Sequence, residues 1–148
     1  MNQQRKIRLA AEYGQLTLPP AGRLQSRTEE PSAYPYDEIY RPYIVAKKQE
    51  STVHALQLIV WSEVREFEIW GMPYSGMTVW EITHAGLTFS CYGYAVTIEG
   101  RGLKQDWRFT EALGKQRVKS ICVWNPAIHH TPPASQACIT RMIREVEE

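Results

Sequence analysis

The sequence predicts an α+β fold: a strongly bent antiparallel β-sheet or small barrel of about five strands, with two helices and an extended N-terminal arm. Two patterns lead to this prediction. Between residues 52 and 100, short alternating apolar segments are separated by turn signals at intervals of about ten residues, which is typical of an antiparallel meander. Within residues 87–98 the apolar positions change parity, which one straight strand with a single buried face does not allow.

Gly93 marks this change of parity. The odd-numbered positions of residues 87–91 are apolar before it, and Val96 and Ile98 are apolar after it. Two interpretations are open: a β-bulge or bend within one long strand, or two strands that separate near Gly93–Ala95.

All the predicted strands carry apolar residues at every second position, or as a short run of strand length between turn residues. In the second of them Phe67 and Ile69 are expected to face the core, and in the third Trp80 and Ile82 share one face. In order, the strands are Leu56–Val60, Arg65–Trp70, Thr78–Thr83, Leu87–Ile98 and Val118–Trp124.

Two segments have helical spacing instead. Leu103–Leu113 follows a corner at Gly100–Gly102, and Gly114 suits the residue after a helix end. Ser135–Glu147 carries a stripe of apolar residues three or four positions apart, so it is predicted to be a helix that closes the domain by docking on the sheet. Dimerisation through that stripe is the alternative.

The composition changes near residue 50. Residues 1–50 are rich in proline and tyrosine and are predicted to form a partly flexible arm, whereas residues 51–148 form a single α+β domain. The arm is interpreted in three ways: it packs on its own domain, it binds a partner or is exchanged between subunits, or it contributes to a ligand site. The tyrosines that would serve a partner are Tyr34, Tyr36, Tyr40 and Tyr43.

Composition limits the functional classes. The 148-residue chain has a formal net charge of +1, so the whole protein is not attracted to nucleic acid or acidic lipid. Three cysteines without CxxC spacing (Cys91, Cys122 and Cys138) indicate a reducing compartment and buried apolar roles. No signal-peptide pattern and no membrane-spanning run is found, so we expect a cytoplasmic protein that does not contact a membrane.

A basic cluster gives the clearest indication of a binding surface. It comprises Arg101, Lys104, Trp107 and Arg108, and Lys104 and Arg108 are four residues apart on the predicted helix. A glycine corner at a helix N-terminus would stabilise a phosphate or another anion, and an aromatic ring beside cations would stack a base. The alternative is a solvated helix face with Trp107 turned into the core.

Catalytic and metal-binding patterns are weak. His129 and His130 are adjacent, which does not fit a chelating pair on a helix, and Cys91 lies in mid-strand without an activating group. We therefore assign no catalytic residue, no metal ligand and no cofactor. An enzyme of unrecognised type, using His84 or His129 near the loop Gly71–Gly76, is kept as an alternative.

The segment Val96–Gly100, which reads Val-Thr-Ile-Glu-Gly, resembles the second motif of Sm-like proteins, an apolar strand that ends in Ile-Arg-Gly. That family has a bent five-stranded antiparallel sheet. The resemblance implies ring-like oligomers and binding of single-stranded RNA. The Asp and Asn of the family's first motif have no counterparts between Thr78 and Gly86, and a helix and a further strand follow where the family continues directly to its last strand.

The predicted function is therefore non-catalytic binding, of single-stranded nucleic acid or of a protein partner, through the basic helix. A homo-oligomer is a further expectation. The alternatives are a subunit that assembles through its tyrosine-rich arm and, less favoured, an enzyme.

Overall fold

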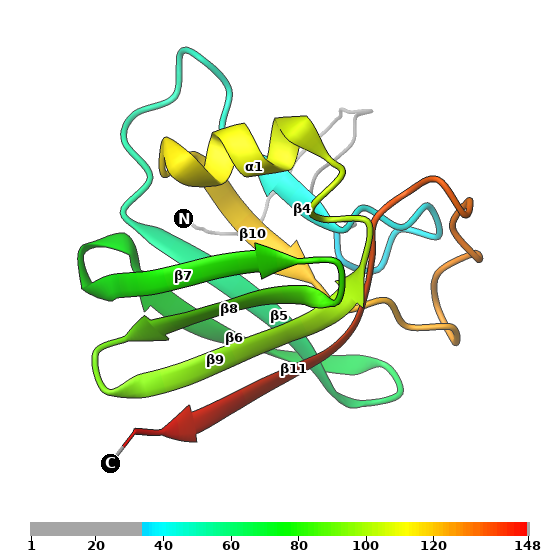
Figure 1. Cartoon of the computed structure of the whole chain (residues 1–148). Coiled ribbons are helices and arrows are strands. Elements are labelled where there is room, and N and C mark those ends of the chain that lie inside the picture. Colours follow the sequence, from blue (N-terminus) through cyan, green and yellow to red (C-terminus); the bar gives the residue numbers. More distant parts are fainter. Residues whose placement is uncertain (1–33, 148) are drawn as a thin grey trace, which may run out of the picture. The chain divides into compact units, whose positions relative to one another are not determined.

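The computed structural model describes residues 34–147, and within them the chain forms two four-stranded sheets and one α-helix (Figure 1). The first sheet contains β4 (Tyr43–Val45), β5 (Ala55–Glu63), β6 (Glu66–Pro73) and β10 (Val118–Cys122). The second contains β7 (Met77–Thr83), β8 (Gly86–Cys91), β9 (Tyr94–Arg101) and β11 (Cys138–Val146). A 3₁₀ turn, η2 (Tyr74–Gly76), leads from β6 to β7, and α1 is Trp107–Gly114.

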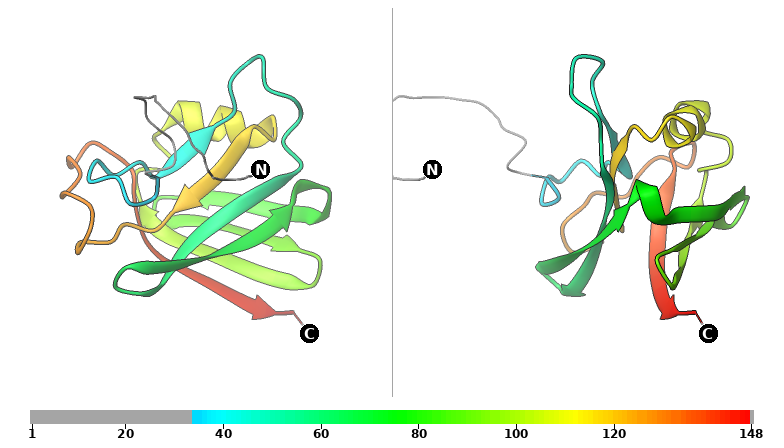
Figure 2. Two further views of the ribbon diagram at one scale, coloured as in Figure 1. Left: turned by 180° about the vertical axis from the view of Figure 1, so that it is seen from behind. Right: turned by 90° about the vertical axis from the view of Figure 1, so that its left-hand side faces the viewer.

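The two sheets differ in their topology. The first has the order β4-β10-β5-β6, and β10 runs parallel to β5 but antiparallel to β4. The second has the order β11-β9-β8-β7 and is antiparallel throughout. Neither sheet closes on itself, so the single bent sheet or small barrel expected from the sequence is replaced by two open layers, seen in Figure 2 with α1 at one end.

The core lies between the two sheets and under α1. It is built from side chains that alternate along the strands and from one face of the helix, as the period-two and helical patterns require. Its most completely buried members are Leu56, Leu58, Leu87, Cys91, Val96, Ile98, Leu103, Phe109, Val118, Ile121 and Ile139.

The parity change at Gly93 has a simple structural explanation. β8 and β9 are two antiparallel strands joined by a turn at Tyr92 and Gly93, both of which have positive φ. Phe89 pairs with Val96 and Leu87 with Ile98, so both apolar sets face the same core. The interpretation with two separate strands is therefore confirmed, and the expected buried role of the cysteines is confirmed as well.

The predicted C-terminal helix Ser135–Glu147 is wrong, because residues 138–146 form strand β11 along β9. The apolar stripe is compatible with either structure. Ile139 and Met142, which are buried, share one face of a helix with a period of about 3.6, and they also share one face of a strand with a period of two that is interrupted by a bulge. The register shifts between Ile139 and Arg141, and this bulge accounts for the helical spacing. β-Branched residues in the segment favour the strand.

Three further details differ from the sequence prediction. The helix begins at Trp107 rather than at residue 103, and the short strand β4 was not anticipated. In β6, Trp70 and Met72 face the core, whereas Ile69 is 48% exposed on the other face of the sheet. In β7, Ile82 packs against the core but Trp80 is 43% exposed, because the pairing with β8 is irregular between Thr78 and Glu81.

The compact unit to which both sheets belong starts at Pro35. Residues 35–50, assigned above to the arm, therefore include β4 and its connections, while residues 1–33 of the predicted arm lie outside the described part of the chain.

Gly86 is required where the β7–β8 turn meets β9. Its φ is +147°, and a Cβ atom at this position would overlap the carbonyl oxygen of Ile98. We expect Gly86→Ala to lower the free energy of unfolding by about 2–3 kcal/mol, because both the backbone conformation and the neighbouring strand resist the added methyl group. Urea denaturation will measure this.

Gly71→Ala is the matched control, since nothing lies within 4 Å of a Cβ atom there. This variant should be nearly as stable as the wild type. Equal losses of stability in the two variants would contradict the close approach at Gly86.

Candidate functional site

Helix α1 is held in place by the carboxylate of Asp106. Oδ1 accepts a hydrogen bond from the amide of Phe109 at 3.1 Å, which makes Asp106 the N-cap, and Oδ2 accepts one from the hydroxyl of Tyr43 at 2.6 Å. The ring of Tyr43 also packs on Phe109, with 4.9 Å between the ring centroids. The start of the helix is therefore fixed to strand β4.

These contacts alter the acidity of the Tyr43 phenol. Its pKa is well above the ordinary tyrosine value, mainly because of burial, and then because of the hydrogen bond to Asp106 and the negative charge of that carboxylate. Arg108 acts in the opposite direction. The phenol stays protonated and remains a donor to the cap.

With one face of α1 buried, the other face presents an unusual surface. Trp107 is 73% exposed, which rules out the alternative in which its ring turns into the core. Arg108 on α1 is exposed too. So is Lys104, but it lies in the turn before α1, so the two cations are not one turn apart on the same helix as the sequence predicted. Neither forms a hydrogen bond or ion pair with another residue in the described part of the chain. A large exposed aromatic ring close in the chain to two such cations is typical of a binding surface.

A basic groove of about 430 Å³ runs between α1 and the connection that follows β4. Its floor is formed by Val45, Ala46 and Ala112, and we call it the α1 groove. Its charged walls are Lys48, Arg108, Lys115, Arg117 and one acid, Glu111.

The charge balance of the α1 groove is positive. Glu111 is already paired with Lys115 at 3.5 Å. Arg117 donates to the carbonyl oxygens of Lys47 and Ser51, which positions the β4–β5 connection without neutralising the guanidinium. Sequence reasoning missed Lys48, because it lies 60 residues before Arg108, and only long-range contacts, namely the strand pair β4–β10 and the packing of Tyr43 on the start of α1, bring the two segments together.

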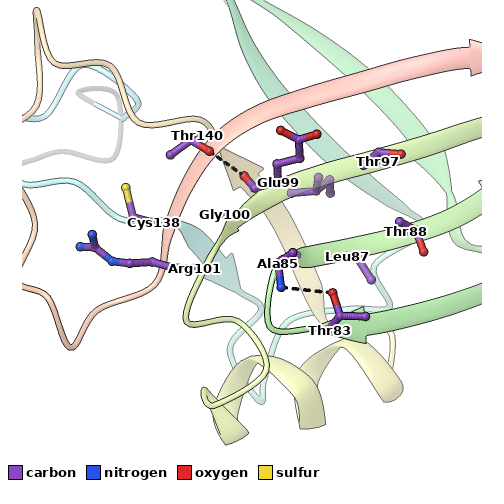
Figure 3. A pocket seen from close by; sticks show the side chains of 12 residues that line it. Thr83, Ala85, Leu87, Thr88, Thr97, Glu99, Gly100, Arg101, Cys138 and Thr140 are labelled. Atoms are coloured by element: carbon purple, nitrogen blue, oxygen red, sulfur yellow. Dashed lines mark hydrogen bonds between the residues drawn. The ribbon is translucent and has the colours of Figure 1, made fainter.

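Arg101 belongs to a different environment (Figure 3). Its guanidinium donates to the carbonyl oxygens of Pro133 at 3.1 Å and Gln136 at 3.3 Å, and so holds the connection between β10 and β11. The structure therefore does not bring it into the α1 groove with Arg108.

The glycine corner before α1 has a structural purpose. The amide of Gly100 donates to the carbonyl of Ala85 at 2.9 Å, and side chains at Gly100 or Gly102 would overlap the backbone of residues 137–138. The helix starts beyond this corner, at the carboxylate cap of Asp106. The corner and the helix N-terminus are therefore separate features, whereas the anion site expected from the sequence combined them.

A hollow of about 530 Å³ lies on the outer face of the second sheet, and Figure 3 shows the side chains that line it. Four threonines line it, Thr83, Thr88, Thr97 and Thr140, together with Glu99, Arg101 and Cys138. Thr83 accepts from the amide of Ala85, and Thr140 donates to the carbonyl of Glu99. The cation that lines this hollow, Arg101, already donates to carbonyl oxygens of the β10–β11 connection. The hollow is therefore less suited to bind an anion than the α1 groove.

The tyrosines of the predicted arm lie within the compact unit, except for Tyr34, which ends the preceding unit. Tyr36 donates to the carbonyl of Arg65 at 2.9 Å, and its ring packs edge-on against Trp61 and Phe67. The Tyr40 hydroxyl donates to the carbonyl of Cys122 at 2.6 Å and accepts from the amide of Ile139 at 3.1 Å. Tyr43 supports the helix cap, so these three side chains serve the domain itself.

The histidines do not form a catalytic arrangement. His129 is buried, and its Nδ1 accepts from the amide of Asn125 at 2.9 Å, so Nε2 carries the proton and donates to the carbonyl of Pro35 at 2.7 Å. His84 is exposed in the β7–β8 turn. Burial raises the pKa of the thiols of Cys91 and Cys138, which lowers their reactivity.

Among residues 34–147, no three His, Cys, Asp or Glu side chains are grouped so as to hold a metal ion. No helix in this part of the chain is both long and apolar enough to cross a membrane. Comparisons with protein-family models, curated proteins and solved structures give no significant match. The resemblance to Sm-like proteins therefore stays a prediction.

The role of Asp106 is tested by Asp106→Ala. We expect the free energy of unfolding to fall by about 1 kcal/mol or somewhat more, because the helix loses its cap and Tyr43 loses its acceptor. Glu111→Ala is the matched control, as it removes the same charge from the same helix but only an exposed pair with Lys115. Thermal unfolding of both variants measures the difference, and equal losses would contradict the capping role.

Stability should also decline as the pH rises above about 10, where free tyrosines titrate. The pKa of Tyr43 is raised by burial and by Asp106, and the pKa of Tyr74 is raised by burial to about 12. Both phenols therefore keep their protons in the folded state at pH values where an unfolded tyrosine with a pKa of 10.0 loses them. The unfolded state then binds fewer protons than the folded state, so the free energy of unfolding falls with increasing pH.

Tyr43→Phe removes one of these two groups and should make the alkaline decline shallower. Urea denaturation from about pH 9 to about pH 11, which spans the titration of free tyrosine, measures the slope. A slope unchanged from the wild type would show that Tyr43 ionises as freely as a tyrosine in the unfolded chain.

Proposed function

We propose that the protein is a non-catalytic module that binds single-stranded nucleic acid, with phosphates in the α1 groove and a base on Trp107. The observation that carries the proposal is the exposed ring of Trp107 on the same short helix as Arg108, which lines a groove of positive charge. On the solvent side of the helix this ring adds nothing to the core, so its faces are available to a ligand.

Phosphate is the ligand group that best fits the groove. Arg108 and Arg117 come from α1 and its C-terminal connection, and Lys48 faces them from the β4–β5 connection. Guanidinium and ammonium groups make charge-assisted hydrogen bonds to phosphate oxygens, and Glu111, the acid that lines the groove, is paired with Lys115. Because the net charge of the protein is +1, the attraction has to come from this local arrangement.

A single strand fits better than a duplex. In a duplex both faces of each base are already stacked, whereas an unpaired base is free to stack on an exposed indole, which is worth about 1–3 kcal/mol per base. Neither the groove nor Trp107 lies on a long helix or two-stranded ribbon of the kind that enters a major groove.

An acidic protein segment is the competing ligand, because Trp and Arg are also frequent at the centres of protein interfaces. It would use the same cations but would not need the flat face of an indole. Assembly through the tyrosine arm has less support, since Tyr36, Tyr40 and Tyr43 contribute their hydroxyl groups to the domain itself.

The test is fluorescence-anisotropy binding to short mixed-sequence RNA and DNA strands. We expect Lys104→Glu/Arg108→Glu to abolish measurable binding, and Trp107→Ala to weaken it by about 5-fold to 100-fold, the equivalent of one stacked base. If Lys48, Lys104 and Arg108 each neutralise one phosphate, the slope of log affinity against log salt should be about −2 for the wild type.

Arg65→Glu is the matched control for charge, because Arg65 lies in the β5–β6 turn, at the other end of the molecule from α1 in Figure 1. This variant should bind like the wild type. Absence of binding to any strand at low salt would refute the proposal. Binding that depends on Arg108 but is indifferent to Trp107→Ala would favour an acidic protein segment instead.

A further inference from the structure

The free edge of the second sheet is formed by its last strand, β11. Within residues 34–147 no strand pairs with β11 on the side away from β9. An unpaired edge presents amide and carbonyl groups that favour pairing with another strand. Independently of any nucleic acid, we propose that β11 pairs with β11 of a second copy of this chain, in an antiparallel and two-fold symmetric arrangement.

The backbone defines which groups are available. The amide of Glu147 donates to the carbonyl of Gly93 at 2.7 Å, and this pair continues the register in which Val146 lies opposite Tyr94. Odd-numbered residues from 141 to 147 therefore direct their backbone groups towards β9. The amides and carbonyls of Met142, Arg144 and Val146 point away from the sheet.

The beginning of β11 is already occupied on that side. Ile139 accepts from the amide of Trp124 at 2.8 Å, and its own amide donates to the Tyr40 hydroxyl. The available edge therefore runs from Thr140 to Val146, and its midpoint is Ile143. A symmetric antiparallel pair centred on the midpoint uses this whole segment in both copies.

The side chains are self-complementary in that register. With Ile143 opposite its own copy, Arg141 lies opposite Glu145, and Glu145 lies opposite Arg141. Met142 and Arg144 then face each other as a hydrogen-bonded pair, which matches their outward backbone groups. The dimer gains two opposite-charge cross-strand pairs on either side of an isoleucine pair, a combination that stabilises antiparallel strands.

Neighbouring registers are less favourable. A shift by one residue opposes outward and inward backbone groups, so no ladder forms. Centring the pair on Arg144 places two guanidinium groups directly opposite each other, which is destabilising. Centring it on Met142 leaves Arg141 opposite an isoleucine. The charge order therefore selects the register at Ile143, and that order identifies a second copy as the occupant of this edge.

The contacts within one chain are compatible with this pairing. Arg141 lies 4.0 Å from the carboxylate of Glu99 on the outer face of the sheet, and both side chains are largely exposed. Arg144 points to the opposite face, where its guanidinium stacks over Trp70 at 4.5 Å and Tyr94 at 5.3 Å from the ring centroids. Neither side chain covers the edge.

Sedimentation equilibrium of the full chain tests the proposal. The wild type should dimerise in a concentration-dependent manner. Arg141→Glu and Glu145→Arg should each weaken the dimer by about tenfold or more, because each change turns both attractive pairs into repulsive ones. The double variant Arg141→Glu/Glu145→Arg should restore the wild-type affinity, since the pairs are reversed but intact.

A mixture of the two single variants gives the sharpest result. In this register the Arg141→Glu chain carries carboxylates at both positions and the Glu145→Arg chain carries guanidinium groups at both, so in the mixed pair each carboxylate lies opposite a guanidinium group. The heterodimer therefore has two attractive pairs, whereas each homodimer has two repulsive ones. The mixture should form a heterodimer with an affinity close to that of the wild type, and a mixture that dimerises no better than either variant alone would contradict the register.

Glu81→Arg on β7, the opposite edge of the same sheet, is the matched control for charge and should dimerise normally. Thermal unfolding of each variant will show that the monomers are folded. Two results would overturn the proposal. One is a wild-type protein that stays monomeric up to its solubility limit. The other is a dimer whose affinity does not respond to the single charge changes or is not restored in the double variant.

Discussion

One buried hydroxyl group connects the two sheets. The Tyr40 phenol, 4% exposed, donates to the carbonyl of Cys122 at the end of β10 and accepts from the amide of Ile139 at the start of β11. Because β10 belongs to the first sheet and β11 to the second, both backbones are held against the same oxygen atom. Removing that atom would leave a buried donor and a buried acceptor unsatisfied, which is costly in a protein interior.

The rest of the arrangement follows from this connection. The chain leaves β10 through Trp124, whose amide bonds to Ile139, and returns as β11 beside β9, where Arg101 holds the intervening segment by its carbonyl oxygens. With that end fixed, β4 is free to pair with the other edge of β10, and its Tyr43 reaches the cap of α1. The position of the α1 groove thus depends on contacts made by the segment before β5.

Much of this fold could be predicted from local sequence patterns, but the candidate site only in part. The alternation in residues 87–98 predicted strand structure and left open whether it divides into the two strands now seen as β8 and β9, whereas a bulge at Thr140 gave β11 an apparent helical period that only pairing with β9 resolves. Exposure of Arg108 follows from helical spacing, but Lys48 enters the groove through a long-range strand pair. Arg101 was grouped with the helix because it lies near the helix in the chain. Its guanidinium instead donates hydrogen bonds to carbonyl oxygens more than thirty residues later in the chain.

Two open sheets have a consequence that a closed barrel does not have, because closure removes strand edges and open sheets leave them exposed. The two described sheets have four edge strands. β4 is only three residues long, β7 is irregular between Thr78 and Glu81, and β6 carries charges of one sign at Glu66 and Glu68, all of which discourage pairing with another chain. β11 is different, because its free edge extends from Thr140 to Val146. When the strand pairs with its own copy, each of its charges at positions 141 and 145 lies opposite a charge of the other sign. A protein that only needed to avoid association would place one sign of charge along such an edge. The alternation of Arg141 with Glu145 around Ile143 instead favours one partner in one register.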